Sequence, residues 1–311
     1  MEYSIRNCPN CQKELPIPTG LEQCICMYCG ENFIIEEQRQ TEDLPVDFRE
    51  MEQAYQHALG QVDSLVSNYT KLLSGFTRDG YRASFQEYVK LGENIMLPVN
   101  LYAKSSEAIL NKVPRDVSEV LISTIEMNIE SSKGLLSGNT KAKLIDQYRY
   151  FLAVYLVPML IYLNLEISDV LVTQIMEDWR KKYPKYEFKK ANYEELAAGF
   201  ERKGFCYITS AVCDIMNKPD DCYELERLRE FRDHYLMKSE EGKRLVEEYY
   251  VTAPRIVTYI NLQTGSEMRY HQIWDRYLVP CLKDIERGHK EKCKRRYIKM
   301  VRQLRSELPF L

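Results

Sequence analysis

Beyond residue 47, apolar residues recur at intervals of three and four positions, which is the spacing of an amphipathic helix. Alternation of apolar and polar residues is scarce there, and glycine and proline fall at intervals that suit helix ends. The pattern therefore predicts a mainly α fold with a multi-helix body. The first 35 residues differ, because they are rich in cysteine, proline and glycine and show little helical periodicity.

Local residues indicate several helix boundaries in this body. The stretch 48–76 is predicted to be one long helix, and Pro114 is placed in the first turn of another. Ser168 is expected to cap a helix that runs through Trp179. Further helices are predicted at residues 193–203, 205–217, 221–237, 240–252 and 266–305, the last broken near Pro280 or Gly288.

The longest apolar run extends over residues 151–163 and contains Pro158. A membrane-spanning helix needs about 20 apolar residues, so this run is interpreted as a core helix and no membrane association is expected. Its sequence Tyr-Leu-Val-Pro-Met-Leu at 155–160 returns as Tyr-Leu-Val-Pro-Cys-Leu at 277–282. This echo reflects either an internal duplication or two core helices that accommodate a proline in the same way, and we favour the second interpretation.

Five of the ten cysteines lie within the first 29 residues. Cys8 and Cys11 form one CxxC pair, and Cys26 and Cys29 form a second after fourteen intervening residues. Two such pairs at this separation are typical of one tetrahedral zinc ion, and Gly30 offers the positive φ that such a turn favours. Four thiolates leave no open coordination position, so the site is predicted to be structural.

Cys24 lies two residues before Cys26 and is the alternative third ligand. Its separation from Cys29 matches the first CxxC pair less well, so Cys26 is preferred. The segment 1–35 resembles the zinc-ribbon family, in which the two cysteine pairs sit on β-hairpins. That resemblance implies a closing strand at residues 32–35, and it does not fix a function, because zinc ribbons bind nucleic acids, proteins or nothing.

Residues 206–260 resemble the CFI-box, a bacterial domain named for its Cys-Phe-Ile start. The resemblance rests on Cys206-Tyr-Ile, on Leu-Arg-Glu-Phe-Arg-Asp at 228–233 and on Ala-Pro at 253–254. The chain departs from the pattern at Tyr207. The predicted domains are a zinc ribbon at 1–35, an acidic linker at 36–47, a helical domain at 48–203, and a helical CFI-box-like domain with a basic C-terminal helix at 204–311.

Cys206 has two interpretations. It is either a small buried residue, or a catalytic thiolate activated by the start of a helix and by Arg229 or Arg232. No histidine stands at a recognisable spacing from it to act as a base. A second metal site formed by Cys206, Cys213 and Cys222 is conceivable, although their spacings differ from the usual ligand pattern.

The net charge of the 311 residues is only -3, yet ten basic and four acidic residues lie between 283 and 307. This basic segment either forms a solvated face that pairs with acidic residues elsewhere, or it binds nucleic acid. No P-loop, HExxH, GxSxG or dinucleotide fingerprint occurs. Dispersed thiols and the absence of a secretory signal favour a cytoplasmic protein.

These observations lead us to expect a zinc-binding interaction or adaptor protein with a protein partner. One alternative is a thiol-dependent enzyme that uses Cys206 as its nucleophile. The other is a protein that binds nucleic acid through the ribbon and the basic C-terminal helix.

Overall fold

The computed structural model describes residues 3–11, 13–18, 23–34, 48–131, 138–201 and 206–309. The sequence also predicts that a helix closes near Gly134, and this position lies outside these ranges. The chain divides into two compact units, Met1–Val46 and Asp47–Leu311. The second unit is helical and the first carries short strands, so the predicted mainly α fold with a small N-terminal β segment is confirmed.

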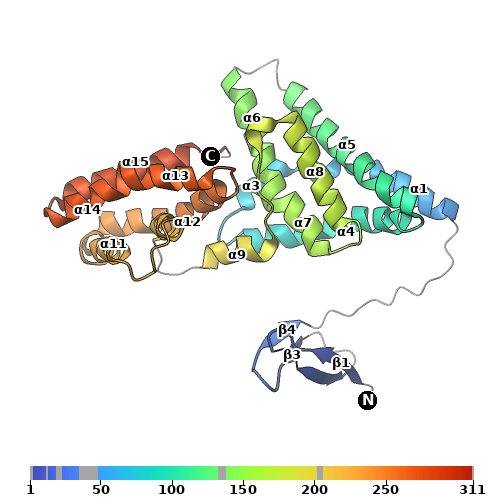
Figure 1. Cartoon of the computed structure of the whole chain (residues 1–311), viewed down its shortest axis with the longest axis horizontal. Helices are drawn as coiled ribbons and strands as arrows, with labels where there is room; N and C mark the ends of the chain where they lie inside the picture. The colour runs from blue at the N-terminus through green and yellow to red at the C-terminus, as the bar shows by residue number, and fades with distance from the viewer. Residues whose placement is uncertain are drawn as a thin grey trace. The chain divides into compact units, whose positions relative to one another are not determined.

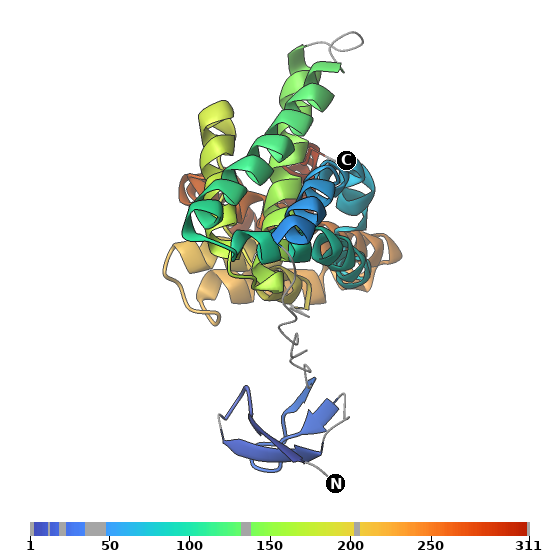
Figure 2. The ribbon, with the colours of Figure 1, turned by 90° about the vertical axis from the view of Figure 1, so that its right-hand side faces the viewer.

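The N-terminal unit consists of two antiparallel hairpins (Figure 2). In the first hairpin Tyr3 pairs with Pro18 and Asn7 with Glu14, and in the second Gln23 pairs with Ile34. The strands are β1 (Tyr3–Asn7), β2 (Glu14–Pro18), β3 (Gln23–Ile25) and β4 (Asn32–Ile34). Leu15 and Ile17 of β2 point inward with Cys8 and Cys26, so the apolar core that the described residues of this unit form is very small.

The helical unit is shown in Figure 1. Its first half contains α1 (Phe48–Leu59), α2 (Ser64–Ser67), α3 (Tyr69–Gly75), α4 (Tyr81–Ala103), α5 (Glu107–Ser131), α6 (Gly138–Phe151), α7 (Val157–Leu163) and α8 (Ser168–Lys182). Its second half contains α9 (Tyr193–Glu201), α10 (Tyr207–Ile215), α11 (Tyr223–His234), α12 (Glu240–Asn261), α13 (Ser266–Ile273), α14 (Val279–Glu286) and α15 (Lys290–Ser306).

The apolar run lies in the middle of the first half of this unit. Residues 140–163 form one continuous helical segment that is long and apolar enough to cross a membrane, but 78% of its most apolar window is buried inside the protein. That burial identifies it as a core helix. α4 and α8 pack against α7, and the rings of Phe76, Tyr81 and Tyr88 surround Tyr155.

Pro158 interrupts the hydrogen bonding of this core helix. A proline has no N–H for the carbonyl four residues before it, which here belongs to Val154. The chain widens into a π-helical turn at Leu152–Leu156, and the hydroxyl of Tyr81 donates to the Val154 carbonyl oxygen at 2.8 Å. A side chain from α4 therefore supplies the donor that the proline removes.

The sequence echo has a structural counterpart. A second π-helical turn, Trp274–Leu278, precedes Pro280, just as Leu152–Leu156 precedes Pro158. Both prolines then occupy the first turn of the helix that follows. The predicted break near Pro280 is thus a π-helical turn, and the chain ends α14 before Gly288, which has a φ of 74°.

Two helix predictions are wrong. Residues 48–76 are not one helix, because the chain breaks after Leu59 and again at Asn68, near Gly60 and other poor helix formers. α5 begins seven residues before Pro114, and Ser106 Oγ accepts from the Ile109 N–H at 3.3 Å at its start. The local cap was therefore Ser106, and Pro114 lies in the helix interior.

Two further boundaries differ from the prediction. Ser168 is the first residue of α8 rather than its cap, and its Oγ accepts from the Leu165 N–H at 3.0 Å in the preceding turn. α12 does not stop at residue 252 but continues through Pro254 to Asn261. Its last turns bury Ala253, Ile256 and Ile260, so tertiary packing outweighs the proline.

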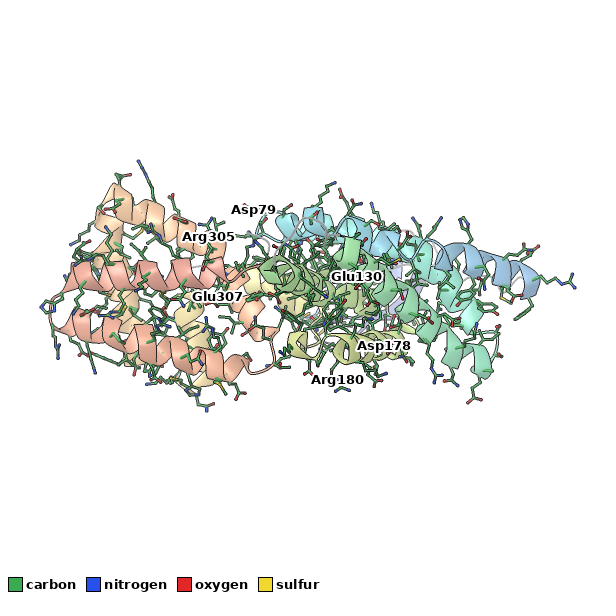
Figure 3. The ribbon with its side chains drawn as sticks, turned by 90° about the horizontal axis from the view of Figure 1, so that it is seen from above. Asp79, Glu130, Asp178, Arg180, Arg305 and Glu307 are labelled. Carbon is green, nitrogen blue, oxygen red and sulfur yellow. The ribbon has the colours of Figure 1, made fainter. Side chains whose placement is uncertain are left out.

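The second half of the helical unit is built by helices that pack closely in pairs. α14 packs on α15, α12 on α10 and α15, and α11 on α14. Figure 3 shows α13, α14 and α15 together at one end of the unit. One continuous cluster of buried side chains extends from Tyr55 to Leu308, and the predicted division of this unit at residues 203 and 204 stays a prediction.

Gly242, in the first turn of α12, provides a test of this packing. A Cβ atom there would lie 1.9 Å from the backbone oxygen of Leu236, so Gly242→Ala forces the backbone apart. We expect a loss of about 1–3 kcal/mol in the free energy of unfolding, measured by urea denaturation.

Gly199 of α9 is the matched control, because a Cβ there would meet only Thr258 Oγ1 at 3.9 Å. Gly199→Ala should stabilise the protein by up to about 1 kcal/mol through helix propensity. Equal effects of the two substitutions would contradict the close approach of the Leu236 and Gly242 backbones.

Candidate functional site

Four cysteines meet at the turns of the two N-terminal hairpins. The Sγ atoms of Cys8, Cys11, Cys26 and Cys29 all lie within 4.8 Å of one another. The Cys8–Cys29 and Cys11–Cys26 sulfur pairs are each 3.6 Å apart. A tetrahedral zinc site with Zn–S bonds of about 2.3 Å has sulfur–sulfur edges of about 3.8 Å. The cluster therefore has the size that a thiolate-bound metal ion requires, and it is consistent with zinc.

The two turns hold their cysteines with equivalent backbone bonds. The Cys8 N–H donates to the Lys13 carbonyl at 3.0 Å, and the Cys26 N–H donates to the Glu31 carbonyl at 2.8 Å. Gly30 has a φ of 75°, so the expected positive φ after the second pair is confirmed. The equivalence explains why both CxxC segments direct their thiols to one point.

Backbone donors tune the thiols of the second turn. Burial raises the pKa of Cys26, but hydrogen bonds from the backbone of Tyr28 and Cys29 outweigh it and bring the pKa to about 7. The backbone of Glu31 lowers the pKa of Cys29, whereas burial and the neighbouring thiols raise it to about 12. Four thiolates at this spacing repel one another, so a bound cation is needed to keep all four ionised.

Cys24 does not join this cluster. It lies on β3, its side chain is half-buried, and its Sγ contacts the Ile25 carbonyl oxygen at 3.6 Å. β3 ends at Ile25, so Cys24 lies on the strand, whereas Cys26 lies at the start of the turn that carries the cluster. The described geometry thus favours Cys26 as the third ligand.

Cys206 lies immediately before α10, at the helix start that the sequence indicated. Its side chain is only 6% exposed, and burial raises the pKa of its thiol although Arg232 and Arg229 act to lower it. The Arg232 guanidinium is 3.9 Å from the sulfur but is bound more closely by Asp233, at 2.6 Å. This environment favours a protonated thiol, whereas a cysteine nucleophile needs the opposite.

Cys213 and Cys222 meet, but Cys206 does not complete a metal site with them. The sulfurs of Cys213 and Cys222 are 3.7 Å apart. Among the residues that the structure describes, the N-terminal cluster is the one group of three or more ligand side chains close enough to share an ion. The conceivable second metal site is therefore not supported.

Several basic residues of the C-terminal segment form ion pairs with acidic residues of the helical unit. Lys294 pairs with Glu241 at 2.8 Å on α12, and Arg296 pairs with the buried Asp284 at 3.1 Å. Burial raises the pKa of Asp284, but hydrogen bonds from Arg296 and from Lys292 outweigh it and lower the pKa. The face of α15 toward its neighbours thus fits the interpretation in which the basic segment pairs with acidic residues elsewhere in the chain.

One stripe of α15 keeps its charge. Arg295, Lys299 and Arg302 are exposed, and they pair with no acidic side chain in the part of the chain that the structure describes. They are separated by four and three positions, so they share one face of the helix. On this face of α15, three cations in a row remain available to an acidic ligand.

Sequence reasoning missed the apolar surface beside the metal cluster. Ile25, Met27 and Tyr28 flank Cys26, and their side chains are 66%, 71% and 54% exposed. Ile5 on β1 is 70% exposed. The signal was present in the sequence as apolar residues around the second CxxC, but only the folded structure shows that Ile25, at the end of β3, and Met27 and Tyr28, in the turn that follows, face solvent rather than the core.

Comparison with known proteins gives no relative: no protein-family model, curated protein or solved structure matches this chain. The resemblance of residues 206–260 to the CFI-box is therefore not supported by a family match. The four-cysteine cluster, by contrast, stands on its geometry alone.

The metal site predicts which cysteine substitution loses bound zinc. The protein should contain one zinc ion per chain, measured by elemental analysis. Cys26→Ser should lose that ion at a chelator concentration that leaves the wild type loaded, because three thiolates and a hydroxyl bind zinc much less tightly.

Cys24→Ser is the matched control and should keep the zinc. Chelation should unfold the hairpins without changing the thermal melting of the helices, because the two units have separate cores. Loss of zinc from Cys24→Ser, with retention in Cys26→Ser, would reverse the assignment of the third ligand.

The raised pKa of Cys206 predicts slow alkylation. Iodoacetamide at pH 7.5 should modify Cys206 in the folded protein at least ten times more slowly than the half-buried Cys222, since only accessible thiolates react. Peptide mass spectrometry measures both rates, and unfolding in guanidinium should make them equal. Faster modification of Cys206 would restore the nucleophile hypothesis.

Proposed function

We propose that this protein is a zinc-dependent adaptor whose N-terminal hairpins recognise a protein partner. The observation that supports the proposal most is the apolar knuckle surface, which we define as Ile25, Met27 and Tyr28. Exposed apolar side chains held on a rigid turn are costly in water and are typical of protein-binding surfaces. Zinc acts here as the structural element that fixes this turn.

The charge near the knuckle surface is compatible with protein recognition. Lys13 stands over the ring of Tyr28 at 4.7 Å, and Glu31 follows the second pair of cysteines. The second CxxC turn itself contains no basic residue. Nucleic-acid recognition depends on phosphate contacts from clustered lysine and arginine, so a protein surface is the better match.

The helical unit would then serve as the scaffold of the adaptor. Its residues 206–260, which resemble the CFI-box, pack together as α10, α11 and α12 around Cys206. Cys206 is buried and the pKa of its thiol is raised, which supports a packing role over catalysis. We place the protein in the reducing cytoplasm, where free thiols and a thiolate-bound zinc persist together.

Quantitative recovery of partners tests the proposal. Tagged full-length protein and the Ile25→Thr/Met27→Gln double variant are crosslinked in the native cell, and the recovered proteins are compared by mass spectrometry. The double variant should lose its partner at least tenfold, because each apolar anchor in an interface contributes more than about 1 kcal/mol. Its zinc content should match that of the wild type.

Met268→Gln is the control, because Met268 is 69% exposed but lies on α13 in the helical unit. It should recover the same partners as the wild type. Identical recovery by the double variant would reject the knuckle surface as the docking site. Recovery of nucleic acid alone, released steeply by salt, would favour the basic stripe of α15 instead.

A further inference from the structure

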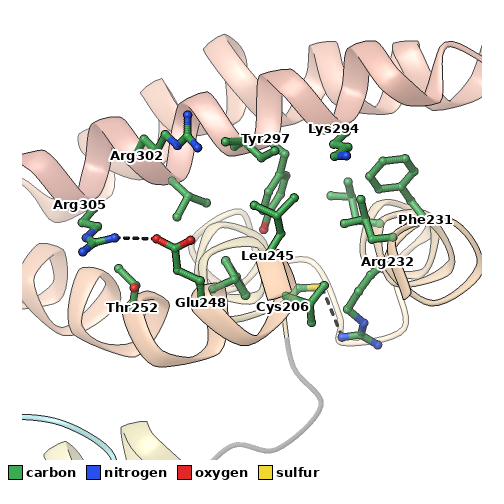
Figure 4. Close-up of a pocket in the computed structure, with 16 residues that line it drawn as sticks. Cys206, Phe231, Arg232, Leu245, Glu248, Thr252, Lys294, Tyr297, Arg302 and Arg305 are labelled. Atoms are coloured by element: carbon green, nitrogen blue, oxygen red, sulfur yellow. Dashed lines mark hydrogen bonds and ion pairs between the residues drawn. The ribbon is translucent and has the colours of Figure 1, made fainter. Parts of the chain in front are cut away.

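α11, α12 and α15 enclose an apolar cavity in the second half of the helical unit (Figure 4). The centre of a water-sized sphere can occupy about 80 Å³ of it, several times the 10–15 Å³ or so that one water molecule needs. Leu228, Phe231 and Val246 line it and are each less than a tenth exposed, as is Cys206. The cavity therefore reaches below the surface and is not a flat patch.

The cavity is elongated along two helices. α15 lines it at positions 294, 297, 298, 301, 302 and 305, which form one face of the helix. At 1.5 Å per residue, this stripe is about 16 Å long. α12 lines the opposite wall over residues 245–252. Such a space accepts an extended chain better than a compact ring system.

The wall between the ends of the cavity offers few hydrogen bonds. The Tyr249 hydroxyl already accepts from the Ile208 N–H at 3.0 Å, and the Tyr297 hydroxyl pairs with Thr209 at 3.4 Å. Leu245, Ile298 and Val301 supply apolar surface. A sugar or a nucleobase would leave its polar groups unpaired on such a wall, whereas an alkyl chain would not.

Charge is available at one end of the cavity. Figure 4 shows Arg302 and Arg305 together, with Phe231 at the far side. Arg305 pairs with Glu248 at 2.6 Å, while the exposed Arg302 has no ion-pair partner among the described residues. At the other end, Lys294 and Arg232 are held by Glu241 and by Asp233. An anionic group is therefore best placed beside Arg302.

We propose that this cavity binds a straight-chain fatty carboxylate. The carboxylate pairs with the Arg302 guanidinium, a geometry that permits two parallel hydrogen bonds. The alkyl chain extends between α12 and α15 toward Leu228 and Phe231. Filling an apolar void restores the dispersion contacts that its lining side chains lack. This site is independent of the N-terminal metal cluster and of the adaptor function.

Calorimetric titration of the full-length protein with sodium dodecanoate, below its micelle concentration, tests the proposal. We expect one molecule to bind per chain. Dodecyltrimethylammonium, which has the same chain length and the opposite charge, should bind at least tenfold more weakly. Arg302→Gln should weaken dodecanoate binding at least tenfold, since it removes a charge-assisted hydrogen bond.

Arg295→Gln is the matched control, because Arg295 is also exposed on α15 but does not line the cavity. Val301→Trp should block binding by filling the space, and its thermal melting shows whether it folds. Arg302→Gln changes only an exposed side chain, so it remains decisive if Val301→Trp does not fold.

Equal binding of both amphiphiles, or unchanged binding to Arg302→Gln, would overturn the proposal. So would binding of an acidic amphipathic peptide at this cavity in the absence of dodecanoate binding, because that result would indicate a protein-docking groove. Neither outcome depends on the zinc site or on the knuckle surface.

Discussion

The helical unit depends on burying one apolar helical segment. The backbone polar groups of that segment must then find hydrogen-bond partners inside the protein. Residues 150–157 are essentially inaccessible to solvent, yet Pro158, which follows them, lacks the N–H that would donate to the Val154 carbonyl. An unpaired buried carbonyl is costly, and the Tyr81 hydroxyl removes that cost at Val154. Because this bond joins α4 to the core helix, the same contact also positions the two helices.

Tyrosine hydroxyls pair with buried polar groups repeatedly, which gives a physical reason for the 23 tyrosines of the chain. The hydroxyl of Tyr88 donates to the Leu65 carbonyl at 3.0 Å, and that of Tyr270 donates to Asn261 at 2.7 Å. Each ring buries a large apolar area while its hydroxyl finds a partner on another segment. Such bonds are directional, so they select among packings that apolar contact alone would allow.

The N-terminal unit cannot be stabilised by a large apolar core. Its described core consists of Leu15, Ile17 and two cysteines, which is too little apolar area to hold short hairpins together. Coordination of a metal ion by the four cysteines would replace the missing core and leave the residues between the ligands free to face solvent. This freedom is what allows Ile25 and Met27 to form an exposed surface beside Cys26.

The sequence determined the elements that depend on local chemistry. Spacing alone indicated the four cysteines at 8, 11, 26 and 29, the glycine with positive φ after them, and the helical nature of the rest. These features follow from near neighbours along the chain, since a CxxC turn or an amphipathic repeat carries its own geometry. The same reasoning failed at Pro114 and Pro254, where packing against distant helices keeps the chain helical through a proline.

Only the tertiary structure decided the environments of individual side chains. It placed Cys206 in a buried site that raises its pKa, and it divided the basic residues of α15 into paired ones and the free stripe that includes Arg302. It also formed the cavity between α11, α12 and α15. Burial, ion pairing and cavities depend on which segments pack against each other. Those segments are far apart in the chain, so local sequence patterns do not reveal their contacts.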